Sequence, residues 1–281
     1  MLAELRRLRI AEYVRQHESG VVTVAELSLL LAVSDMTIRR DLALLERQST
    51  LRRVHGGAVA YQQSNGDKSF LYRTQRADPQ KQLIGWLAAQ LVNDGDRIIL
   101  DAGTTTLQLA NNLTCKNQLT VITNNIPVAN QLAQCANILI ILLGGIVKHN
   151  ESCTVGNMVR QSLSLLSADK YFLSATHFSL RMGAMETDMA ETEVKQAMLR
   201  SASQTILLAD STKFDVSALI QVAPLQQIHK IVCDDGLPPE AMRAIEAEGV
   251  QVITPSRQPF GALPEHIRLL LDCTTPLKAQ A

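Results

Sequence analysis

The sequence predicts an α/β protein with two domains, a small, mostly helical N-terminal domain and a larger domain built on a mainly parallel sheet. Two short helical segments and a glycine-containing hairpin account for most of the first 58 residues. Beyond residue 78, apolar strands alternate with helices, which is typical of a parallel sheet covered on both faces. With 281 residues, of which 46% are hydrophobic, the chain is long enough to form two cores.

A capping signal marks the start of a helix in the N-terminal domain. Thr23 and Glu26 have the S/T-x-x-E spacing of a capping box, so a helix is expected over residues 24–32. Ser34 can cap a second helix, because its hydroxyl accepts a hydrogen bond from a free amide of the first turn. The inward face of this second helix is expected to carry three apolar residues at helical spacing, Ile38, Leu42 and Leu45.

Two short helices in this order are the outline of a helix-turn-helix, whose second helix enters the major groove of DNA. The outward face of the second helix is polar and basic, which suits contact with bases and phosphates. We therefore expect double-stranded DNA as a partner, bound by Thr23, Ser34, Asp35, Met36, Thr37, Arg39 and Arg40. The alternative is an ordinary amphipathic helix pair with a solvated arginine face.

The segment after these helices predicts a β-wing. Residues 51–54 are expected to form one of its strands, and Gly56-Gly57 makes a turn that a bulkier pair would make only at a cost. Side chains beside such a turn lie along the DNA backbone. The DNA contacts expected from the wing are Arg52, Arg53 and His55.

The charge of the chain is balanced, with 27 basic and 27 acidic residues. Residues 1–60 contain nine arginines, no lysine and seven acids, which gives this part a charge of +2. Because the excess is small, a positive DNA-binding face has to come from the arrangement of the arginines. Arginine without lysine indicates bidentate contact with phosphate or guanine, although the composition of a short domain explains the bias equally well.

Cysteine spacing and apolar runs bear on cofactors and location. The five cysteines are scattered singly, without C-x-x-C or Cys/His spacing, so we expect free thiols, no metal and no cofactor. Free thiols are typical of the reducing cytoplasm. The longest apolar run, 138–143, is too short to span a bilayer, and the N-terminus lacks the apolar core of a signal peptide. We therefore expect a soluble, cytoplasmic protein without a membrane partner.

Four segments are predicted along the chain: a winged helix-turn-helix domain over 1–58, a polar linker over 59–77, a ligand-binding domain over 78–254 and a C-terminal extension over 255–281. Asp78 and Pro79 start the larger domain with a helix, as its cap and its first residue. The extension is interrupted by prolines, and its apolar segment 267–271 packs either on the body or on another subunit.

Strands and helices alternate through the larger domain. The expected strands are Arg97–Asp101, Leu119–Thr123, Ile138–Leu143, Lys170–Ser174, Thr205–Ala209, Lys230–Cys233 and Val250–Ile253. The helices between them are expected near residues 105–113, 126–134, 157–166, 189–202 and 238–247.

Ligands of such sheets bind at the carboxyl ends of the strands, so the residues that follow the strands are candidate site residues. After the first strand, a glycine allows a tight turn, and three threonine hydroxyls converge with the free amides of a helix N-terminus. This combination forms an anion site, most naturally for phosphate, although a simple helix cap is the alternative. The expected contacts in this loop are Asp101, Gly103, Thr104, Thr105 and Thr106.

Other strand ends add polar groups and space. Asn124 has an amide suited to sugar hydroxyls, and Gly144-Gly145 leaves room for a ligand. Asp210 follows a further strand, and Lys213 can reach the same anion. Glu191 and Lys195 lie four residues apart on an expected helix, so they are candidates for an ion pair, with a solvated helix face as the alternative. These two residues complete the expected ligand site.

Both parts of the chain carry recurring motifs of one known family. Residues 33–42 read V-S-D-M-T-I-R-R-D-L, and residues 51–58 read L-R-R-V-H-G-G-A. The larger domain contributes Asp101–Thr105, Thr123-Asn124, Gly144-Gly145, Val155-Gly156, Glu191/Lys195 and Asp210–Phe214. On these motifs the chain resembles the DeoR family of bacterial transcriptional regulators over residues 6–58 and 70–254.

The resemblance implies a fold, a function and partners. The larger domain of the family is related in fold to ribose-5-phosphate isomerase and coenzyme A transferases. The implied function is that of a transcriptional regulator, most naturally a repressor of a carbohydrate-utilisation operon, whose operator binding is modulated by a phosphorylated sugar or related metabolite. Because a single winged domain makes few contacts with DNA, a homodimer or homotetramer on paired half-sites is expected.

The chain departs from the family pattern at two places. Ser49 stands where the family usually has the glycine that closes the recognition helix, and serine in that left-handed conformation costs more. Residues 174–178 read S-A-T-H-F where the family has G-x-D/N-G-I, so this corner loses a carboxylate. His177 either contacts the ligand or fills space there.

An enzyme is the alternative function, namely a sugar-phosphate isomerase or deaminase with an appended DNA-binding domain. Isomerisation needs a base beside the acidic carbon of the substrate and an acid for its oxygen. Since the corner at 174–178 lacks a carboxylate, one candidate base position is empty. We therefore expect a regulator without catalytic residues.

Overall fold

The computed structural model describes residues 3–16, 21–47, 51–54, 56–60, 70–75, 78–258, 265 and 267. The chain divides into two compact units, residues 1–68 and residues 69–281. The first unit combines helices with a small antiparallel sheet, and the second is built on a seven-stranded parallel sheet. This architecture confirms the predicted fold class.

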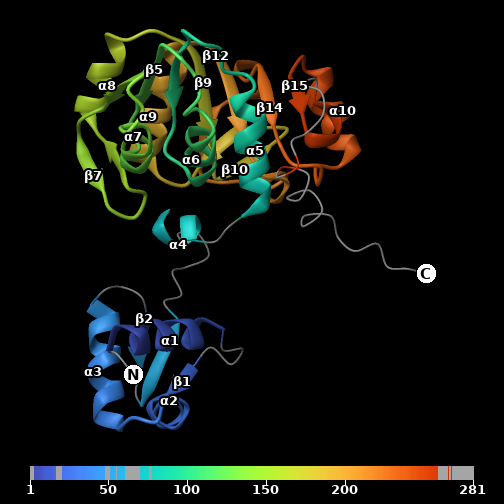
Figure 1. The fold of residues 1–281 in the computed structure, drawn as a ribbon. Helices are drawn as coiled ribbons and strands as arrows, with labels where there is room; N and C mark the ends of the chain where they lie inside the picture. Colours follow the sequence, from blue (N-terminus) through green and yellow to red (C-terminus); the bar gives the residue numbers. More distant parts are fainter. Residues whose placement is uncertain are drawn as a thin grey trace. The chain divides into compact units, whose positions relative to one another are not determined.

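The smaller unit is a helix-turn-helix followed by a β-wing (Figure 1). Its elements are α1 (Ala3–Gln16), β1 (Val21–Thr23), α2 (Val24–Leu31), α3 (Asp35–Arg47), β2 (Leu51–Val54) and β3 (Gly57–Ala60). α2 begins at the predicted capping box and ends at Ala32, whose φ of 50° is left-handed. The strands pair antiparallel in the order β1-β3-β2. All three helices contribute to one apolar core, which includes Ile10, Val14, Leu27, Ile38, Leu42 and Leu45.

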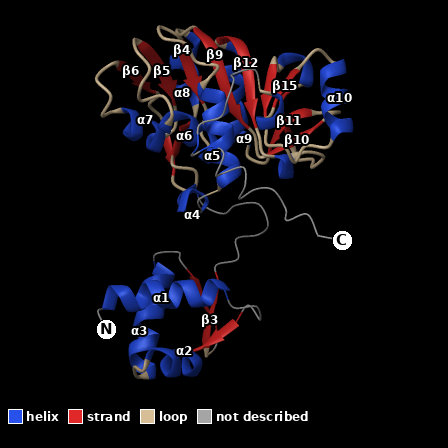
Figure 2. Cartoon of the chain, turned by 45° about the vertical axis from the view of Figure 1, so that its right-hand side comes forward, coloured by secondary structure: helices blue, strands red, loops and turns tan. Residues whose placement is uncertain are grey.

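The larger unit is built on parallel strands in the order β15-β14-β12-β9-β4-β5-β6 (Figure 2). The bounds are β4 (Arg97–Leu100), β5 (Leu119–Thr123), β6 (Ile138–Leu142), β9 (Ala168–Ser174), β12 (Ala202–Leu208), β14 (Lys230–Val232) and β15 (Gln251–Ile253). Each corresponds to a predicted strand, although several ends differ by one to three residues.

Helices cover both faces of this sheet. One face packs against α5 (Pro79–Ala89), α6 (Thr104–Asn111) and α7 (Ile126–Leu132), and the other against α8 (Asn157–Ser164), α9 (Met189–Arg200) and α10 (Pro239–Ala247). Successive side chains of β4 alternate between the two cores: Ile98 and Leu100 join the first, and Ile99 joins the second. Strands buried on both faces in this way read as continuous apolar runs, which explains why they were recognisable in the sequence.

The order of the strands changes direction beside β4. From β4 the chain moves outward to β5 and β6, and it then returns to the other side of β4 to form β9, β12, β14 and β15. A crevice at the carboxyl ends of the strands is expected where the direction changes, which here is between β4 and β9.

Several short elements were not predicted. A hairpin of β7 (Ile146–Lys148) and β8 (Cys153–Val155) follows β6, and a second antiparallel sheet contains β10 (His177–Ser179), β11 (Gly183–Glu186) and β13 (Ile220–Ala223). Three or four residues are too few for a recognisable alternation. The predicted linker is only partly connecting chain, because residues 59 and 60 end β3 and α4 (Phe70–Gln75) is helical.

No helix within the described ranges is both long enough and apolar enough to cross a bilayer. Of the predicted C-terminal extension, the described part consists of a 3-10 turn over Pro255–Arg257, residue 258 and two isolated residues, 265 and 267. Ile267 is buried.

Candidate functional site

The first turns of α3 present most of the residues predicted to contact DNA. The Ser34 carbonyl oxygen accepts hydrogen bonds from the backbone amides of Thr37 and Ile38, at 2.9 and 3.1 Å, and so starts the helix. The exposed side chains of this segment are Ser34, Asp35, Met36, Arg39 and Arg40, with Thr37 half-buried among them. Arg39 and Arg40 are exposed and form no ion pair with the described part of the chain, and their contact with DNA remains a prediction.

A buried carboxylate holds this helix in place. Asp41 accepts a hydrogen bond from Nε of Arg6 at 2.6 Å and lies 3.8 Å from Nη1 of Arg7, which ties α3 to α1. Asp41 was not among the residues predicted to have a role. The available signal was its spacing, since Asp41 lies three residues after Ile38 and one before Leu42, on the inward stripe of the helix.

Thr23 serves the fold of the helix-turn-helix. Its hydroxyl oxygen accepts a hydrogen bond from the amide of Glu26 at 3.2 Å, and the Glu26 carboxylate accepts one from the amide of Thr23 at 3.4 Å. The capping box predicted from the sequence is therefore confirmed. A DNA contact from Thr23 remains a prediction.

The wing turn depends on its two glycines. Gly56 has a φ of +80°, and a Cβ on Gly57 would lie 2.2 Å from the carbonyl oxygen of Val22. Arg53, one of the predicted DNA contacts, is exposed but pairs with Glu46 at 3.0 Å. His55, the side chain of Arg52 and the unusual Ser49 lie outside the described residues.

In the larger unit, the predicted ligand residues gather along the carboxyl ends of neighbouring strands. In sheet order, Asp210 comes two residues after β12, Ser174 ends β9, Asp101 directly follows β4, Asn124 directly follows β5 and Gly144 comes two residues after β6. The structure therefore brings together residues that are up to 109 positions apart in the sequence.

A buried ion pair bridges the point where the strand order changes direction. Lys195 Nζ lies 2.7 Å from Oδ2 of Asp101 and 2.7 Å from the carbonyl oxygen of Ser174. The same carboxylate oxygen accepts a hydrogen bond from the amide of Ser174 at 3.0 Å. Asp101 and Lys195 together therefore link the ends of β4 and β9 to α9.

The predicted pairing of Lys195 with Glu191 is wrong, because Lys195 turns to Asp101. Glu191 instead accepts a hydrogen bond from Lys148 of β7 at 2.5 Å, and Lys148 also pairs with Asp188 at 2.8 Å. The alternative of a solvated face is wrong as well, since Glu191 and Lys195 are both buried. The i, i+4 spacing places both residues near the site without pairing them.

The ionisation of this cluster reflects burial and opposite charge. Burial raises the pKa of Asp101 above its ordinary value, and Lys195 and two backbone amides counter part of that rise. Burial disfavours the charged form of Lys195 and so lowers its pKa. The nearby Asp101, Glu186 and Glu191 outweigh this effect and hold the pKa of Lys195 above its ordinary value.

The loop over residues 101–106, here called the threonine loop, passes close to β9 at its start. A Cβ on Gly103 would lie 2.4 Å from Oγ of Ser174, so only glycine fits. The Thr106 hydroxyl lies 2.8 Å from the carbonyl oxygens of Asp101 and Gly103, which closes the loop. Among described residues, the hydroxyls of Thr104 and Thr105 have no hydrogen-bond partner, and both residues lie in the first turn of α6.

Two buried amide atoms beside this loop lack partners. Asn124 donates to the carbonyl oxygen of Thr154 at 2.8 Å, but its Oδ1 has no hydrogen bond with the described residues. Asn125 caps α7 through its Oδ1, at 3.0 Å from the amide of Val128, while its Nδ2 lacks a partner there. A buried amide atom without a partner indicates a place for a ligand or an ordered water.

The two glycines after β6 differ. Gly144 has open space where a side chain would be, as the sequence analysis expected. Gly145 does not, because a Cβ there would lie 2.6 Å from the carbonyl oxygen of Val155. Gly145 therefore allows β8 to approach closely and leaves no room for a ligand.

Lys213 lies at the same strand ends, and two cations from other segments act on it electrostatically, although Lys81 pairs with Asp78 and Arg73 with Glu151. Lys213 donates a hydrogen bond to the carbonyl oxygen of Ala175 at 2.9 Å, next to Ser174. Burial lowers the pKa of Lys213, and the positive charges of Lys81 and Arg73 lower it further, against the opposing effect of Asp210. Lys81 and Arg73 were not among the predicted site residues. Arg73 was hidden because its helix α4 lies inside the segment taken as a linker.

A carboxylate also occupies the corner that the sequence analysis left empty. Glu186 of β11 is buried, and its Oε1 accepts hydrogen bonds from the Thr176 hydroxyl at 2.8 Å and the Thr187 amide at 2.9 Å. Its Oε2 lies 3.7 Å from Nζ of Lys195. His177 is half-buried, with Nδ1 3.1 Å from the Thr176 hydroxyl. No sequence pattern pointed to Glu186, because its strand β11 belongs to the second, antiparallel sheet and not to the parallel sheet whose strand ends were predicted.

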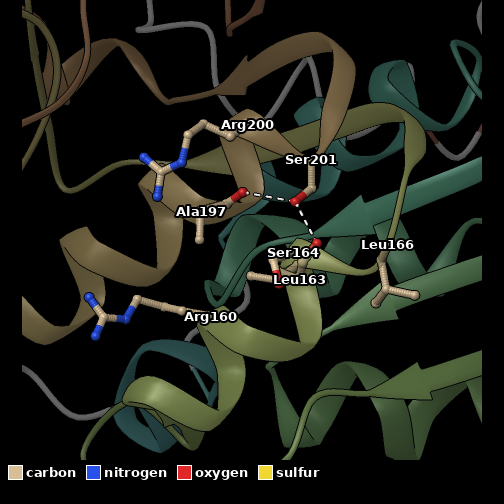
Figure 3. A pocket seen from close by; sticks show the side chains of 7 residues that line it. All are labelled: Arg160, Leu163, Ser164, Leu166, Ala197, Arg200 and Ser201. Atoms are coloured by element: carbon tan, nitrogen blue, oxygen red, sulfur yellow. Dashed lines mark hydrogen bonds between the residues drawn. The ribbon is translucent and has the colours of Figure 1, made fainter.

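A pocket lies elsewhere, between the carboxyl-terminal turns of α8 and α9 (Figure 3). The Ser201 hydroxyl there lies 3.0 Å from the carbonyl oxygens of Leu163 and Ala197. Because β9 and β12 begin directly after these helices, the pocket is at the amino ends of the strands. Within the part of the chain that is described, no three His, Cys, Asp or Glu side chains are grouped to hold a metal ion.

Comparison with known proteins gives matches for both units. Residues 6–64 match the family model of the DeoR-like helix-turn-helix domain, and residues 76–235 match that of the DeoR C terminal sensor domain. The chain is 36% identical over 252 residues to the HTH-type transcriptional regulator YulB of Bacillus subtilis (strain 168), which covers 90% of this chain and 96% of the relative.

Two further relatives have names that mention repression. A putative aga operon transcriptional repressor of Escherichia coli O157:H7 is 32% identical over 255 residues (88% and 92% covered). The HTH-type transcriptional repressor GlcR of Bacillus subtilis (strain 168) is 34% identical over 254 residues (90% and 96% covered). Among solved structures, ribose 5 phosphate isomerase A from Neisseria gonorrhoeae is similar with a TM-score of 0.37 and 13% identity, over 50% of this chain and 54% of that one. A likeness at this level carries no conclusion about activity.

Proposed function

Because this chain belongs to the DeoR family of transcriptional regulators, we propose that it represses a carbohydrate-utilisation operon and that a phosphorylated sugar or related metabolite modulates its operator binding. The names of the aga operon repressor and GlcR support this direction. In this proposal, the exposed turns of α3 enter the major groove and the wing follows the backbone. The protein acts as a homodimer or homotetramer on half-sites spaced by multiples of about 10–10.5 base pairs.

The observation that carries the effector proposal is the position of Lys213 beside a loop with free hydroxyls and amides. Lys213 is anchored at Ala175, one residue from the Ser174 side chain that touches Gly103, and Lys81 and Arg73 act on the same lysine. The amides that open α6 and the hydroxyls of Thr104 and Thr105 add donors. A phosphate matches this arrangement, because helix N-termini and charge-assisted hydrogen bonds both favour a compact anion.

The buried amides supply the sugar-binding part of the proposal. Oδ1 of Asn124 can accept a hydrogen bond and Nδ2 of Asn125 can donate one, as the alternating hydroxyls of a sugar require. A few convergent polar groups of this kind are typical of small-molecule recognition.

A thermal-shift panel of phosphorylated sugars and their unphosphorylated counterparts tests the effector site. A ligand at 100 times its dissociation constant should stabilise the larger unit by roughly 2.7 kcal/mol. We expect this response from a phosphorylated compound, its loss in Lys213→Ala, and its retention in Lys230→Ala. Lys230 begins β14 and so lies at the opposite ends of the strands. A full panel without any response, or an equal response in both variants, contradicts the proposed site.

A sugar-phosphate isomerase or deaminase is the second candidate function, and Glu186 is the observation that favours it. This buried carboxylate and Lys195 are 3.7 Å apart at the corner between β9 and β11, which provides an acid–base pair near the proposed ligand. Turnover of an aldose or ketose phosphate that is lost in Glu186→Gln would establish an enzyme. Absence of turnover with a compound that binds in the thermal-shift panel would remove this candidate.

A further inference from the structure

The β6 end of the parallel sheet is a free edge. β6 pairs with β5, and no strand among the described residues pairs with its other side (Figure 2). Leu143 donates its amide to the carbonyl oxygen of Thr123 in β5 at 2.8 Å. Because amides alternate in direction along a strand, those of Ile140 and Leu142 point away from β5. Such an edge is a template for another strand.

The side chains around this edge are apolar and exposed. Leu139 of β6 is 62% exposed, and Ile146 of β7 is 72% exposed. The start of α8 lies beside them, since a Cβ on Gly145 would be 2.8 Å from Val159 of that helix. We refer to these residues as the β6 surface: Leu139, Leu142, Ile146, Val147 and Met158.

Charged residues are absent from the sequence of β6 and from a long stretch around it. The 31 residues from Asn117 to Val147 contain no Lys, Arg, Asp or Glu, and this stretch includes β5, α7 and β6. Free edges are usually protected by charged residues, proline or a bulge. β6 contains none of these, and its pairing with β5 has a regular register.

The opposite edge of the same sheet provides a contrast. β15 has only three residues, exposes Gln251 at its start and follows the acidic residues Glu246 and Glu248. Short length and nearby charge are ordinary protection for an edge strand. The lack of protection is therefore particular to the β6 end.

The geometry points to a second copy of this chain as the occupant of the β6 surface, with the two β6 strands paired antiparallel about a two-fold axis. In a contact with two-fold symmetry, the same patch of both copies meets. An uncharged strand can pair with its own copy in this way without charge repulsion and without burying an unpaired ion. DNA is a poor occupant, because the surface offers no cation. Pairing satisfies the outward amides of both copies and joins two parallel sheets into one.

This inference rests on the proposed function in one respect: a regulator that binds an operator with two half-sites is expected to be a dimer with two-fold symmetry. The experiments that test them are separate. The thermal-shift response reports the effector site whether or not β6 pairs, and the mass in solution reports the β6 surface whether or not an effector binds.

Sedimentation equilibrium of the full chain tests the β6 surface. We expect the wild type to associate to at least twice the 30.8 kDa of one chain. The double variant Leu139→Lys/Ile146→Lys should raise the dimer dissociation constant at least about 100-fold, because each copy would bury unpaired ammonium groups. Leu219→Lys is the matched control, since Leu219 is 83% exposed and lies outside the β6 surface. A monomeric wild type, or unchanged association in the double variant, would overturn the inference.

Hydrogen exchange of the wild type gives a second test that does not depend on variants that fold. The amides of Ile140 and Leu142 should exchange more slowly at high protein concentration than at low concentration. The amides of β15 should show no such dependence. Equal exchange of the β6 amides at both concentrations would contradict strand pairing.

Discussion

Arg40 and Asp41 are neighbours in the sequence and have opposite roles in the structure. Arg40 is exposed and free of ion pairs within the described residues, whereas Asp41 is buried against Arg6. The helical period fixes this difference, because successive residues of a helix are turned about 100° apart. A motif of consecutive charged residues therefore contains both a surface for a partner and a support for the helix that carries it.

Replacing Arg39 or Arg40 by alanine should weaken operator binding. If the side chain contacts guanine, the expected cost is roughly 1–3 kcal/mol at that base pair. If it contacts phosphate, binding should weaken on all sequences and the salt dependence should fall by about one unit of slope. Titrations at several salt concentrations distinguish these cases. Arg200→Ala, which removes an exposed arginine of α9, is the control. Wild-type binding by both variants would remove α3 as the recognition helix.

Lys195→Met should lower the free energy of unfolding by roughly 3–5 kcal/mol, because it leaves Asp101 buried without its counter-ion. Burial already raises the pKa of Asp101, and loss of Lys195 raises it further. A carboxyl group whose pKa is higher in the folded state than in the unfolded state destabilises the folded protein less as the pH falls, because the folded state takes up its proton first. The loss measured by urea unfolding should therefore be smaller in mild acid than at neutral pH.

The double variant Asp101→Asn/Lys195→Met is the control for this prediction. It removes both charges and should recover part of the lost stability at neutral pH. A loss that grows on acidification would show that Asp101 is not the uncompensated charge.

Elements differed in how well the sequence predicted them. The long parallel strands and the helices between them were found because both have enough residues for their periodicity to be visible. The strands of the two small antiparallel sheets were missed because they have three or four residues and depend on tertiary pairing. Helix α4 was missed because its six residues follow a polar stretch.

The candidate site shows the same limit. Sequence reasoning found the residues that directly follow the strands, such as Asp101 and Asn124, since parallel strands end on one side of a sheet. It missed Arg73, Lys81 and Glu186, which come from the short helix, the start of α5 and the second sheet. It also paired Lys195 with the wrong acid, because a preference along a helix gives no information about a carboxylate 94 residues away.

Phe70→Ala should detach α4 from the larger unit. Phe70 is almost fully buried in the core that α5, α6 and β4 share, and its amide bonds to the carbonyl oxygen of Asn150 at 2.7 Å. We expect a loss of stability of about 3–5 kcal/mol and a weaker response to phosphorylated ligands, because α4 carries Arg73. Leu165→Ala, at an exposed site, is the control for calorimetry. A Phe70→Ala protein with wild-type stability and ligand response would contradict a role for α4.

At the scale of the whole molecule, two units with different chemistry share one chain. The first exposes arginines on a helix-turn-helix, and the second gathers buried charges and unpaired amides at the ends of its parallel strands. A balanced net charge is compatible with DNA binding because Arg39 and Arg40 are exposed next to each other near the start of α3. Regulation requires that the ligand state of the second unit alters the affinity of the first for DNA.

The most direct test of this coupling is the operator dissociation constant of the full chain, measured with and without the phosphorylated sugar that stabilises it. Coupling between two sites is typically about 1–3 kcal/mol. We predict a change of roughly 5- to 150-fold for the wild type and Lys230→Ala, and none for Lys213→Ala. An operator affinity that stays the same when the stabilising ligand is saturating would contradict the account.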